Sequence, residues 1–377
     1  MSNNTLSRAE LSTKGKIRNI HYGDVLIKFS DVIDANNTSI PFIGSEATLK
    51  KSTDYLQTGD VIIADTAEDD TVGKAVEMLN PNGIPVVSGL HTIPCRPNLS
   101  FVSSYLGYYL NSKSFHEQLY PFMQGIKVTS ISKANIGKTL ISYPELAEQS
   151  KISGLLNLVS KRIEKQRQLV ETLKLYKRGV IQSVFSESSY GGKLAEKWTE
   201  KSIAKIFNCI IDKGHPEADV LTITQGFGTT RRDTGNRHIS YDKASVASYK
   251  KVALNDFILH LRSFEGGLEI ANESGIVSPA YTILRSKFII SPQFYYAYFR
   301  SYAFINGKLR IAVEGIRDGK SINMDTFWKI TIPFPSLEEQ ERFAKIFAGF
   351  DTAINQANIM LDKLDTLKRG LLDKLFI

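Results

Sequence analysis

The chain has 377 residues, of which 42% are hydrophobic, so it can bury substantial cores and is not intrinsically disordered. Its formal net charge of +8 is consistent with a polyanionic partner but is weak alone, because many soluble proteins are equally basic. The two cysteines lie far apart and no apolar run approaches the length of a membrane span, which argues against a disulfide scaffold and a membrane protein and predicts a cytoplasmic one.

Mixed and helical segments alternate along the chain. After a polar arm of about 15 residues, short apolar runs between Gly, Asn, Asp and Pro predict strands up to about residue 142. The aromatic segment 102–120 predicts one helix. A long helical pattern, a Ser- and Gly-rich linker at 186–192, a second mixed segment from 194 to about 331 and a second long helix follow. The predicted strands include residues 25–27, 60–64 and 84–87.

The two long helical patterns are copies of each other at a constant offset of 191 residues, as between Pro144 and Pro335 and between Arg178 and Arg369. An internal repeat of this kind is a primary indicator of architecture. In both copies apolar residues recur at alternating spacings of three and four, which is a heptad seam that needs a partner helix. The other copy is the natural partner, and each helix would be about 60 Å long. The alternative is two amphipathic helices that each pack on their own domain.

The starts and seams of these helices carry further signals. Ser336 followed by Glu339 has the spacing of a capping box. Lys177 and Lys368 occupy matching seam positions, where a charge costs stability and often fixes register or orientation.

The two mixed segments also resemble each other, though less closely. Residues 59–63 match 255–259, residues 125–127 match 315–317, and both segments contain an aromatic helix. The loops between these landmarks do not match. We therefore expect one scaffold that carries two different sets of loops, which is typical of two binding modules with different ligands.

The sequence contains no recognisable catalytic constellation. It lacks any Pro-Pro pair, which an adenine methyltransferase tetrapeptide would require, and residues 315–321 have one residue too few for a P-loop. None of the six histidines forms an HxH or HxxxH pair suited to a metal. Together these absences favour a binding protein with no catalytic residue, cofactor or metal.

Candidate nucleic-acid contacts lie in loops after predicted strands. Arginine suits guanine edges or phosphate, and asparagine suits adenine. The densest basic loop, 229–238, contains four candidates, and Arg262 follows the next strand before two glycines that permit close approach of a ligand. The matching loop of the first half, 65–74, is acidic but ends in a lysine. The alternative for each residue is a solvated surface position. The candidates are Arg231, Arg232, Asn236, Arg237, Arg262, Lys74, Lys127 and Arg317.

The pattern as a whole resembles the specificity subunit of type I restriction–modification enzymes. The resemblance covers nearly the whole chain from about residue 17. It rests on two variable modules that alternate with two near-identical helices. Each helix opens with an aromatic-Pro-x-Leu-x-Glu-Gln motif and ends with Lys-Arg-Gly and a terminal Phe. These motifs stand at residues 143–149, 177–185, 334–340 and 368–376.

The resemblance implies a division of labour. In that family each variable module is a target recognition domain that reads one half of a split DNA sequence, and the helices set the unread spacer. The helices also form a platform for two methyltransferase (modification) subunits, which carry S-adenosylmethionine, and restriction (motor) subunits join for cleavage. The family offers no base-reading motif to transfer, so the candidate contacts rest on loop position and charge.

The sequence therefore predicts an α+β protein with a pseudo-two-fold internal repeat. Two mixed α/β target recognition domains, residues 1–143 and 188–333, are separated by two long antiparallel helices, residues 144–187 and 334–377, that form a coiled coil. The predicted partners are double-stranded DNA, two methyltransferase subunits and restriction subunits, with no membrane. The alternatives are a stand-alone bipartite DNA-binding regulator, a fused methyltransferase and a protein-bridging adaptor, of which the adaptor would lack the steep salt dependence of DNA binding.

Overall fold

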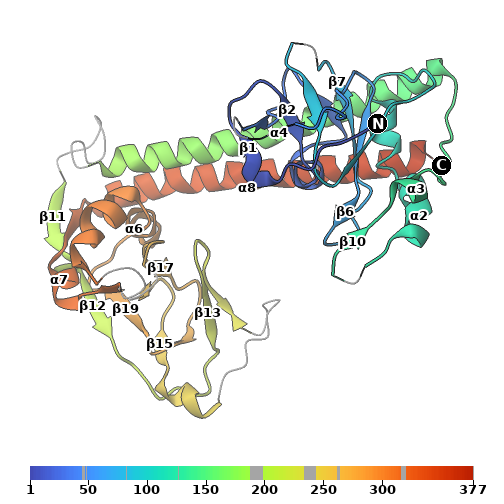
Figure 1. Ribbon diagram of the computed structural model, residues 1–377. Coiled ribbons are helices and arrows are strands. Elements are labelled where there is room, and N and C mark those ends of the chain that lie inside the picture. The colour runs from blue at the N-terminus through green and yellow to red at the C-terminus, as the bar shows by residue number, and fades with distance from the viewer. Residues whose placement is uncertain are drawn as a thin grey trace. The chain divides into compact units, whose positions relative to one another are not determined.

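The computed structural model describes residues 1–44, 47, 49–81, 83–125, 127–186, 198–232, 243–260, 264–315 and 320–376. The chain forms two compact units. Unit 1 comprises Met1–Gln168 and Ile359–Ile377, and unit 2 comprises Leu169–Asn358. Each contains a mixed set of strands and short helices together with parts of two long helices (Figure 1).

Unit 1 is built around two four-stranded sheets. The first has the order β3-β7-β5-β9, with β3 parallel to β7 and the other neighbours antiparallel. The second has the order β1-β4-β2-β8, and β6 pairs with β10. The strands are β1 (Leu11–Ser12), β2 (Arg18–Ile20), β3 (Val32–Asp34), β4 (Phe42–Ile43), β5 (Val61–Ala64), β6 (Thr66–Ala67), β7 (Ala75–Leu79), β8 (Val86–Ser88), β9 (Thr92–Cys95) and β10 (Thr129–Ser130). The short helices are α1 (Tyr105–Tyr109), α2 (Lys113–Leu119) and α3 (Lys133–Ile136).

Unit 2 has one four-stranded antiparallel sheet, of order β12-β19-β16-β17, and four two-stranded ribbons. The ribbons pair β11 with β22, β13 with β14, β15 with β18 and β20 with β21. The strands are β11 (Thr199–Ser202), β12 (Phe207–Ile210), β13 (Leu221–Thr224), β14 (Gly228–Arg231), β15 (Lys250–Val252), β16 (Phe257–His260), β17 (Glu269–Ile270), β18 (Gly275–Val277), β19 (Tyr281–Ser286), β20 (Val313–Glu314), β21 (Ser321–Ile322) and β22 (Thr331–Phe334). Its short helices are α5 (Ile203–Ile206), α6 (Pro292–Phe299) and α7 (Met324–Lys329).

The two long helices are α4 (Leu146–Phe185) and α8 (Leu337–Leu375), of 40 and 39 residues. In unit 1 they are linked by an ion pair between Arg167 and Asp365, and in unit 2 by one between Lys177 and Asp351. The matching seam lysine, Lys368, pairs with Asp31 of unit 1. Both lysines therefore have carboxylate partners, which offsets the cost of partly burying their charges.

A phenylalanine at the end of α4 and another directly after α8 are each buried in an aromatic cluster. In unit 1, Phe376 makes edge-on ring contacts with Tyr105 and Tyr109 of α1. In unit 2, Phe185 makes edge-on contacts with Phe294 and Tyr298 of α6. Such edge-to-face pairs add to the free energy gained by burying the rings.

A glutamine near the start of each long helix makes the same two contacts in both units. The side-chain oxygen of Gln149 accepts a hydrogen bond from the backbone N–H of Val102, while its amide nitrogen donates to the carbonyl of Pro144. Gln340 accepts from the N–H of Ser291 and donates to the carbonyl of Pro335. Both carboxamides are buried and thus have the hydrogen-bond partners that burial requires.

A buried aspartate before the central strand is also held alike. Asp60 precedes β5 and accepts two hydrogen bonds from Arg96, and Asp256 precedes β16 and accepts two from Arg285. Each carboxylate also accepts a backbone N–H three residues upstream. Because one partner is a bidentate guanidinium, these are charge-assisted contacts of the stronger kind.

Three sequence expectations were wrong in detail. Residues 25–27 lie in a helical turn, Asp24–Lys28, instead of a strand, with Val25 buried and Ile27 89% exposed. The segment 102–120 forms two helices instead of one, because the Ser112 hydroxyl caps a new helix by accepting from the N–H of Phe115. At the start of α8 only half of the capping box forms, since the Glu339 side chain accepts from the indole of Trp198.

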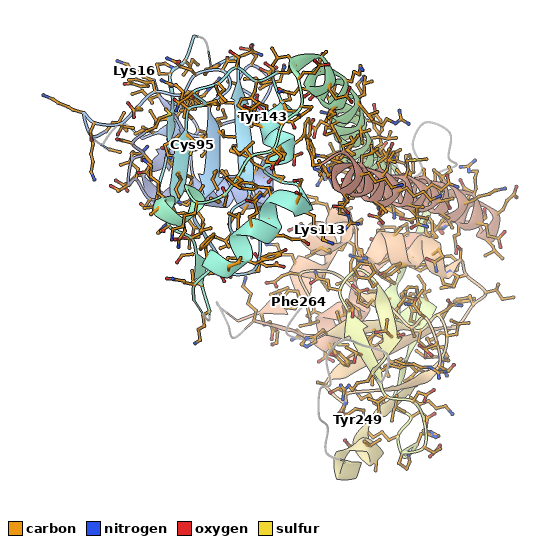
Figure 2. The ribbon with its side chains drawn as sticks, turned by 90° about the vertical axis from the view of Figure 1, so that its right-hand side faces the viewer. Lys16, Cys95, Lys113, Tyr143, Tyr249 and Phe264 are labelled. Carbon is orange, nitrogen blue, oxygen red and sulfur yellow. The ribbon has the colours of Figure 1, made fainter. Side chains whose placement is uncertain are left out.

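Neither cysteine takes part in a disulfide. Cys95 is half-buried on β9, where it is labelled in Figure 2, and Cys209 is exposed on β12. Among the helices of the described residues, none combines the length and apolar character needed to cross a membrane.

Glu77 on β7 is an ionisable group enclosed in the core of unit 1, with 2% of its surface exposed. Its two carboxylate oxygens accept hydrogen bonds from the backbone N–H groups of Ser104 and Gly107, at 2.7 and 2.9 Å. Burial nonetheless dominates and raises the pKa of Glu77 to about 7, against 4.5 for an ordinary glutamate. The folded chain therefore retains this proton over a pH range in which the unfolded chain has lost it.

We predict that unit 1 loses stability as pH rises from about 4.5 to about 7 and that Glu77→Gln removes this loss. The unfolded state binds fewer protons in that window, so the free energy of unfolding falls by up to about 3 kcal/mol. Thermal unfolding of both proteins at pH 5 and pH 8 measures the difference. The free energy of unfolding of the variant minus that of the wild type should be larger at pH 8 than at pH 5. Glu117→Gln, an exposed control, should unfold with the wild-type pH dependence, and an identical dependence in Glu77→Gln would contradict the assignment.

Candidate nucleic-acid interface

The β13–β14 hairpin of unit 2 carries two of the candidate arginines. Its register pairs Leu221 with Arg231 and Thr224 with Gly228, so Arg231 stands at the open end of the hairpin and Arg232 follows it. Asn236 and Arg237 of the same basic loop lie outside the described residues, as do Arg262 and Arg317. The hairpin therefore positions the start of the basic loop.

Arg231 is exposed but has carboxylate partners. Its guanidinium forms ion pairs with Asp219 at 3.2 Å and Glu273 at 2.7 Å. The hydrogen bond to Glu273 raises the pKa of Arg231, so it is a permanent cation. The Arg232 side chain is half-buried and donates to the Thr222 hydroxyl at 3.4 Å. The carboxylates orient the Arg231 fork, and a phosphate or guanine edge would have to compete with them for it.

Lys74 in unit 1 has a different environment from that expected of a surface contact. Its ammonium group is half-buried and donates to the carbonyls of Leu26 and Phe29, at 2.9 and 3.1 Å. Burial lowers the pKa of Lys74, partly against the effect of nearby Asp31. These contacts tie the end of the 65–74 loop to the helical turn at Asp24–Lys28 and its flank.

Lys127 is exposed on a tight turn in unit 1. The turn follows Gly125, whose φ of +123° favours glycine, and a bridge between Gln124 and Ser130 closes it. A Cβ added at Gly125 would lie 1.9 Å from the carbonyl oxygen of Val128. The glycine is therefore required for the turn, and the turn presents Lys127 to solvent.

Polar side chains of unit 1 gather beside the β6–β10 ribbon, at the start of the 65–74 loop, and include His91, which the sequence patterns had not indicated. The Nδ1 atom of His91 lies 3.3 Å from the Thr66 hydroxyl and 3.2 Å from the Asp65 carboxylate. His91 adopts a φ of +53°, which is uncommon for a non-glycine residue. The cluster offers donors and acceptors at the surface. Sequence alone could not reveal it, because His91 is 25 residues away from Thr66.

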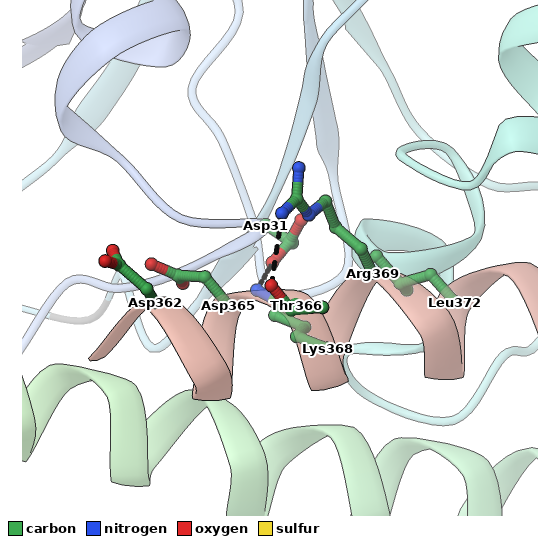
Figure 3. A pocket seen from close by; sticks show the side chains of 7 residues that line it. All are labelled: Asp31, Asp362, Asp365, Thr366, Lys368, Arg369 and Leu372. Atoms are coloured by element: carbon green, nitrogen blue, oxygen red, sulfur yellow. Dashed lines mark hydrogen bonds and ion pairs between the residues drawn. The ribbon is translucent and has the colours of Figure 1, made fainter. Parts of the chain in front are cut away.

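An open hollow of about 560 Å³ in unit 1 lies along α8 (Figure 3). Lys368 pairs there with Asp31, and Arg369 donates to the Thr366 hydroxyl at 3.3 Å. Its lining contains three aspartates and two cations, so it is not a basic surface suited to phosphate. Within the described part of the chain, no cluster of three or more His, Cys, Asp or Glu side chains is placed to hold a metal ion.

Comparisons with known proteins give a consistent family assignment. Residues 195–361 match the model of the type I restriction modification DNA specificity domain. The putative type I restriction enzyme MjaX specificity subunit of Methanocaldococcus jannaschii is 21% identical over 335 residues, covering 84% of this chain and 77% of that protein. The type I restriction enzyme EcoKI specificity subunit of Escherichia coli is 20% identical over 390 residues, covering 93% and 81%.

A comparison of structures, which does not use the sequence alignments above, supports the same fold. A chain from a structure that concerns complex assembly and conformational transition of the type I R-M system aligns with a TM-score of 0.57 at 18% identity, over 92% of this chain and 90% of that chain. The relatives are named specificity subunits and not methyltransferases or nucleases. The family match and these names support the predicted family, and they agree with the expectation of a non-catalytic subunit.

We predict that Lys127→Ala and Lys74→Ala have separable effects. Lys127 is exposed, so its loss should weaken DNA binding uniformly across sequences and reduce the magnitude of the slope of log K against log salt by about 1, with unchanged thermal stability.

Lys74 donates to two carbonyls, so its loss should destabilise unit 1 by about 1–3 kcal/mol. Fluorescence anisotropy over a salt series and thermal unfolding measure the two effects. A salt slope lowered by Lys74→Ala in a stably folded protein would contradict this division.

Proposed function

We propose that the chain is a type I restriction–modification specificity subunit that reads a bipartite DNA sequence in the cytoplasm. The family match over residues 195–361 and the similar specificity subunits support this. Residues 1–143 would read one half of the target and residues 188–333 the other, each as a target recognition domain. Among the described residues, the side chains proposed to contact DNA are the exposed Lys127 and the neighbouring Arg231 and Arg232. Outside the described residues, the proposed contacts are Asn236, Arg237, Arg262 and Arg317.

The observation that carries this proposal is the recurrence of one set of structural contacts under different loops. The buried Asp–Arg pair, the helix-start glutamine and the terminal phenylalanine occur once in each unit. Around this scaffold, unit 1 exposes the Asp65, Thr66 and His91 cluster, whereas unit 2 exposes the β13–β14 hairpin. Two modules with a common scaffold and different surfaces suit two different half-sites.

The helices would act as the spacer between the half-sites. We propose that residues 144–187 and 334–377 pair as an antiparallel coiled coil in a pseudo-two-fold repeat. Ion pairs between α4 and α8 in each unit support this arrangement, and so do the buried seam residues Ile163, Val170 and Ala357. Half-sites one turn of DNA apart need a separator of roughly 35 Å, and helices of about 60 Å are long enough.

Two modification subunits and the restriction subunits are the proposed protein partners. S-adenosylmethionine and the methyl transfer to adenine would belong to the modification subunits. The long helices keep large apolar side chains exposed, among them Leu158, Leu175, Tyr176 and Leu367, and such side chains suit a docking surface. The similar solved structure concerns complex assembly of a type I R-M system, which agrees with this proposal.

We predict that the chain, co-expressed with a cognate modification subunit, produces adenine methylation at a split motif with a fixed gap. Long-read sequencing of the host genome measures the modified positions. Omitting the chain should abolish the signal. A contiguous motif, or methylation that persists without the chain, would sink the proposal and favour a protein-bridging adaptor. A split site bound by the chain without any modification subunit would favour a stand-alone regulator.

We predict that replacing residues 194–331 with the matching segment of a relative changes one half of the methylated motif. The other half and the gap should stay the same, because the first module and both helices are retained. Methylation mapping of the chimaera provides the measurement, with the reciprocal replacement of residues 17–142 as the matched control. A change in both halves would show that the modules do not read independently.

A further inference from the structure

The turn of the β13–β14 hairpin has a defined geometry. The N–H of Phe227 donates to the carbonyl of Thr224 at 3.0 Å, which closes a four-residue turn. Gly226 occupies its third position with a φ of +90°, as a type II turn requires, and Gly228 follows with a φ of +77°. A Cβ on Gly228 would lie 2.5 Å from the carbonyl oxygen of Ile270, so this glycine also permits close packing on the sheet.

Polar groups of unit 2 hold the turn on both sides of Phe227. The carboxylate of Glu269, which is buried, accepts the N–H of Gly226 at 2.8 Å and that of Gly228 at 3.2 Å. The Asn272 amide donates to the carbonyl of Phe227 at 2.6 Å. The Tyr296 hydroxyl donates to Glu269 in turn and fixes the carboxylate. The backbone at Phe227 is thus set before any ligand arrives.

The side chain of Phe227 does not share in this packing, because 74% of its surface is exposed. Leaving a phenylalanine in water forgoes about 1.5–3 kcal/mol of burial free energy. The same exposure on a loose loop would carry little information. Here the backbone that carries the ring is held by these hydrogen bonds, so binding a ligand requires no further ordering of the backbone.

We propose that Phe227 is an apolar wedge that stacks on the bases at one step of the half-site read by unit 2. This inference rests on the proposed function and adds one residue and one mode of reading to it. Insertion of the ring would make the half-site depend on how easily that step unstacks, which favours flexible pyrimidine–purine steps. The contact is sequence-selective through deformability and not through a hydrogen bond to a base edge.

The surroundings of the turn favour nucleic acid over a protein pocket as the occupant. The strand that leaves the turn ends at Arg231 and Arg232 follows it, so a ring inserted at a base step brings two guanidinium groups to the same duplex. Exposed hydroxyl groups on Thr224 and Thr230 flank the turn, and threonine hydroxyls suit phosphate and sugar contacts. The hairpin also lies within the residues that match the DNA specificity domain.

The experiment uses the full chain in complex with its modification subunits and duplexes that carry the motif found by methylation mapping. Phe227→Ala, Phe227→Leu and Ile289→Ala are compared with the wild type. Ile289 is the control because it is an apolar side chain of unit 2 with 85% exposure outside the hairpin. Dissociation constants come from fluorescence anisotropy over a salt series. 2-Aminopurine placed at each step of the half-site reports unstacking.

Phe227→Ala should weaken binding to the cognate duplex about tenfold, because one base-stacking contact is lost. The salt slope should stay unchanged, since no phosphate contact is removed. Phe227→Leu should bind with intermediate affinity, and Ile289→Ala should bind like the wild type. 2-Aminopurine fluorescence should rise at one step with the wild type and not with Phe227→Ala.

Three results would overturn the proposal. In the first, Phe227→Ala binds and unstacks the duplex like the wild type. In the second, the variant loses its modification subunits while the free chain keeps its DNA affinity, which identifies Phe227 as a protein contact. In the third, the wild type yields no split motif, and the proposed function then fails before any variant is made. The first two results leave that function standing.

Discussion

The burial of one helix-terminal phenylalanine in each unit is the interaction on which the remaining structure depends. Phe376 closes the aromatic cluster of unit 1, and Phe185 closes that of unit 2. Because α4 and α8 each contribute residues to both units, neither unit has a complete core without the pair of helices. Truncating a buried phenylalanine costs about 3–5 kcal/mol, a large fraction of the stability of a typical domain. The helix ends are therefore part of the module cores and not appendages to them.

This constraint explains why the scaffold recurs while the surface does not. The glutamines Gln149 and Gln340 join the start of each helix to the segment before an aromatic helix through the same pair of hydrogen bonds. The Asp60–Arg96 and Asp256–Arg285 pairs fix the entry to the central strand. These contacts involve buried groups whose loss would leave an unpaired charge or amide. Substitutions in the exposed loops leave no buried group unpaired, so the loops of the two units can differ without this loss of stability.

The long helices could be predicted from sequence because their seam repeats over many turns, and every turn adds to the same signal. The short elements could not, since a single capping hydroxyl at Ser112 outweighs the continuous aromatic pattern around it. Lys74 belongs to an acidic loop that predicts a surface position, yet its ammonium group is bound by two carbonyls that lie 48 and 45 residues away. The side chain that holds the hairpin turn is likewise distant in sequence. Glu269 lies 43 residues from Gly226 and 41 residues from Gly228, whose N–H groups it accepts.

On the proposed reading of DNA, the β13–β14 hairpin of unit 2 would combine two physical modes of recognition. At its open end, the Arg231 guanidinium is exposed but balanced by Asp219 and Glu273, so its electrostatic attraction is local and oriented. At its turn, the neutral ring of Phe227 is attached to a backbone that hydrogen bonds with Glu269 and Asn272 hold in place. Charge contacts position a duplex and weaken with salt, whereas stacking depends on the bases and hardly on salt. If both proposed contacts form, the cation at one end of the hairpin would contribute mainly to affinity and the aromatic ring at the other end mainly to sequence selectivity.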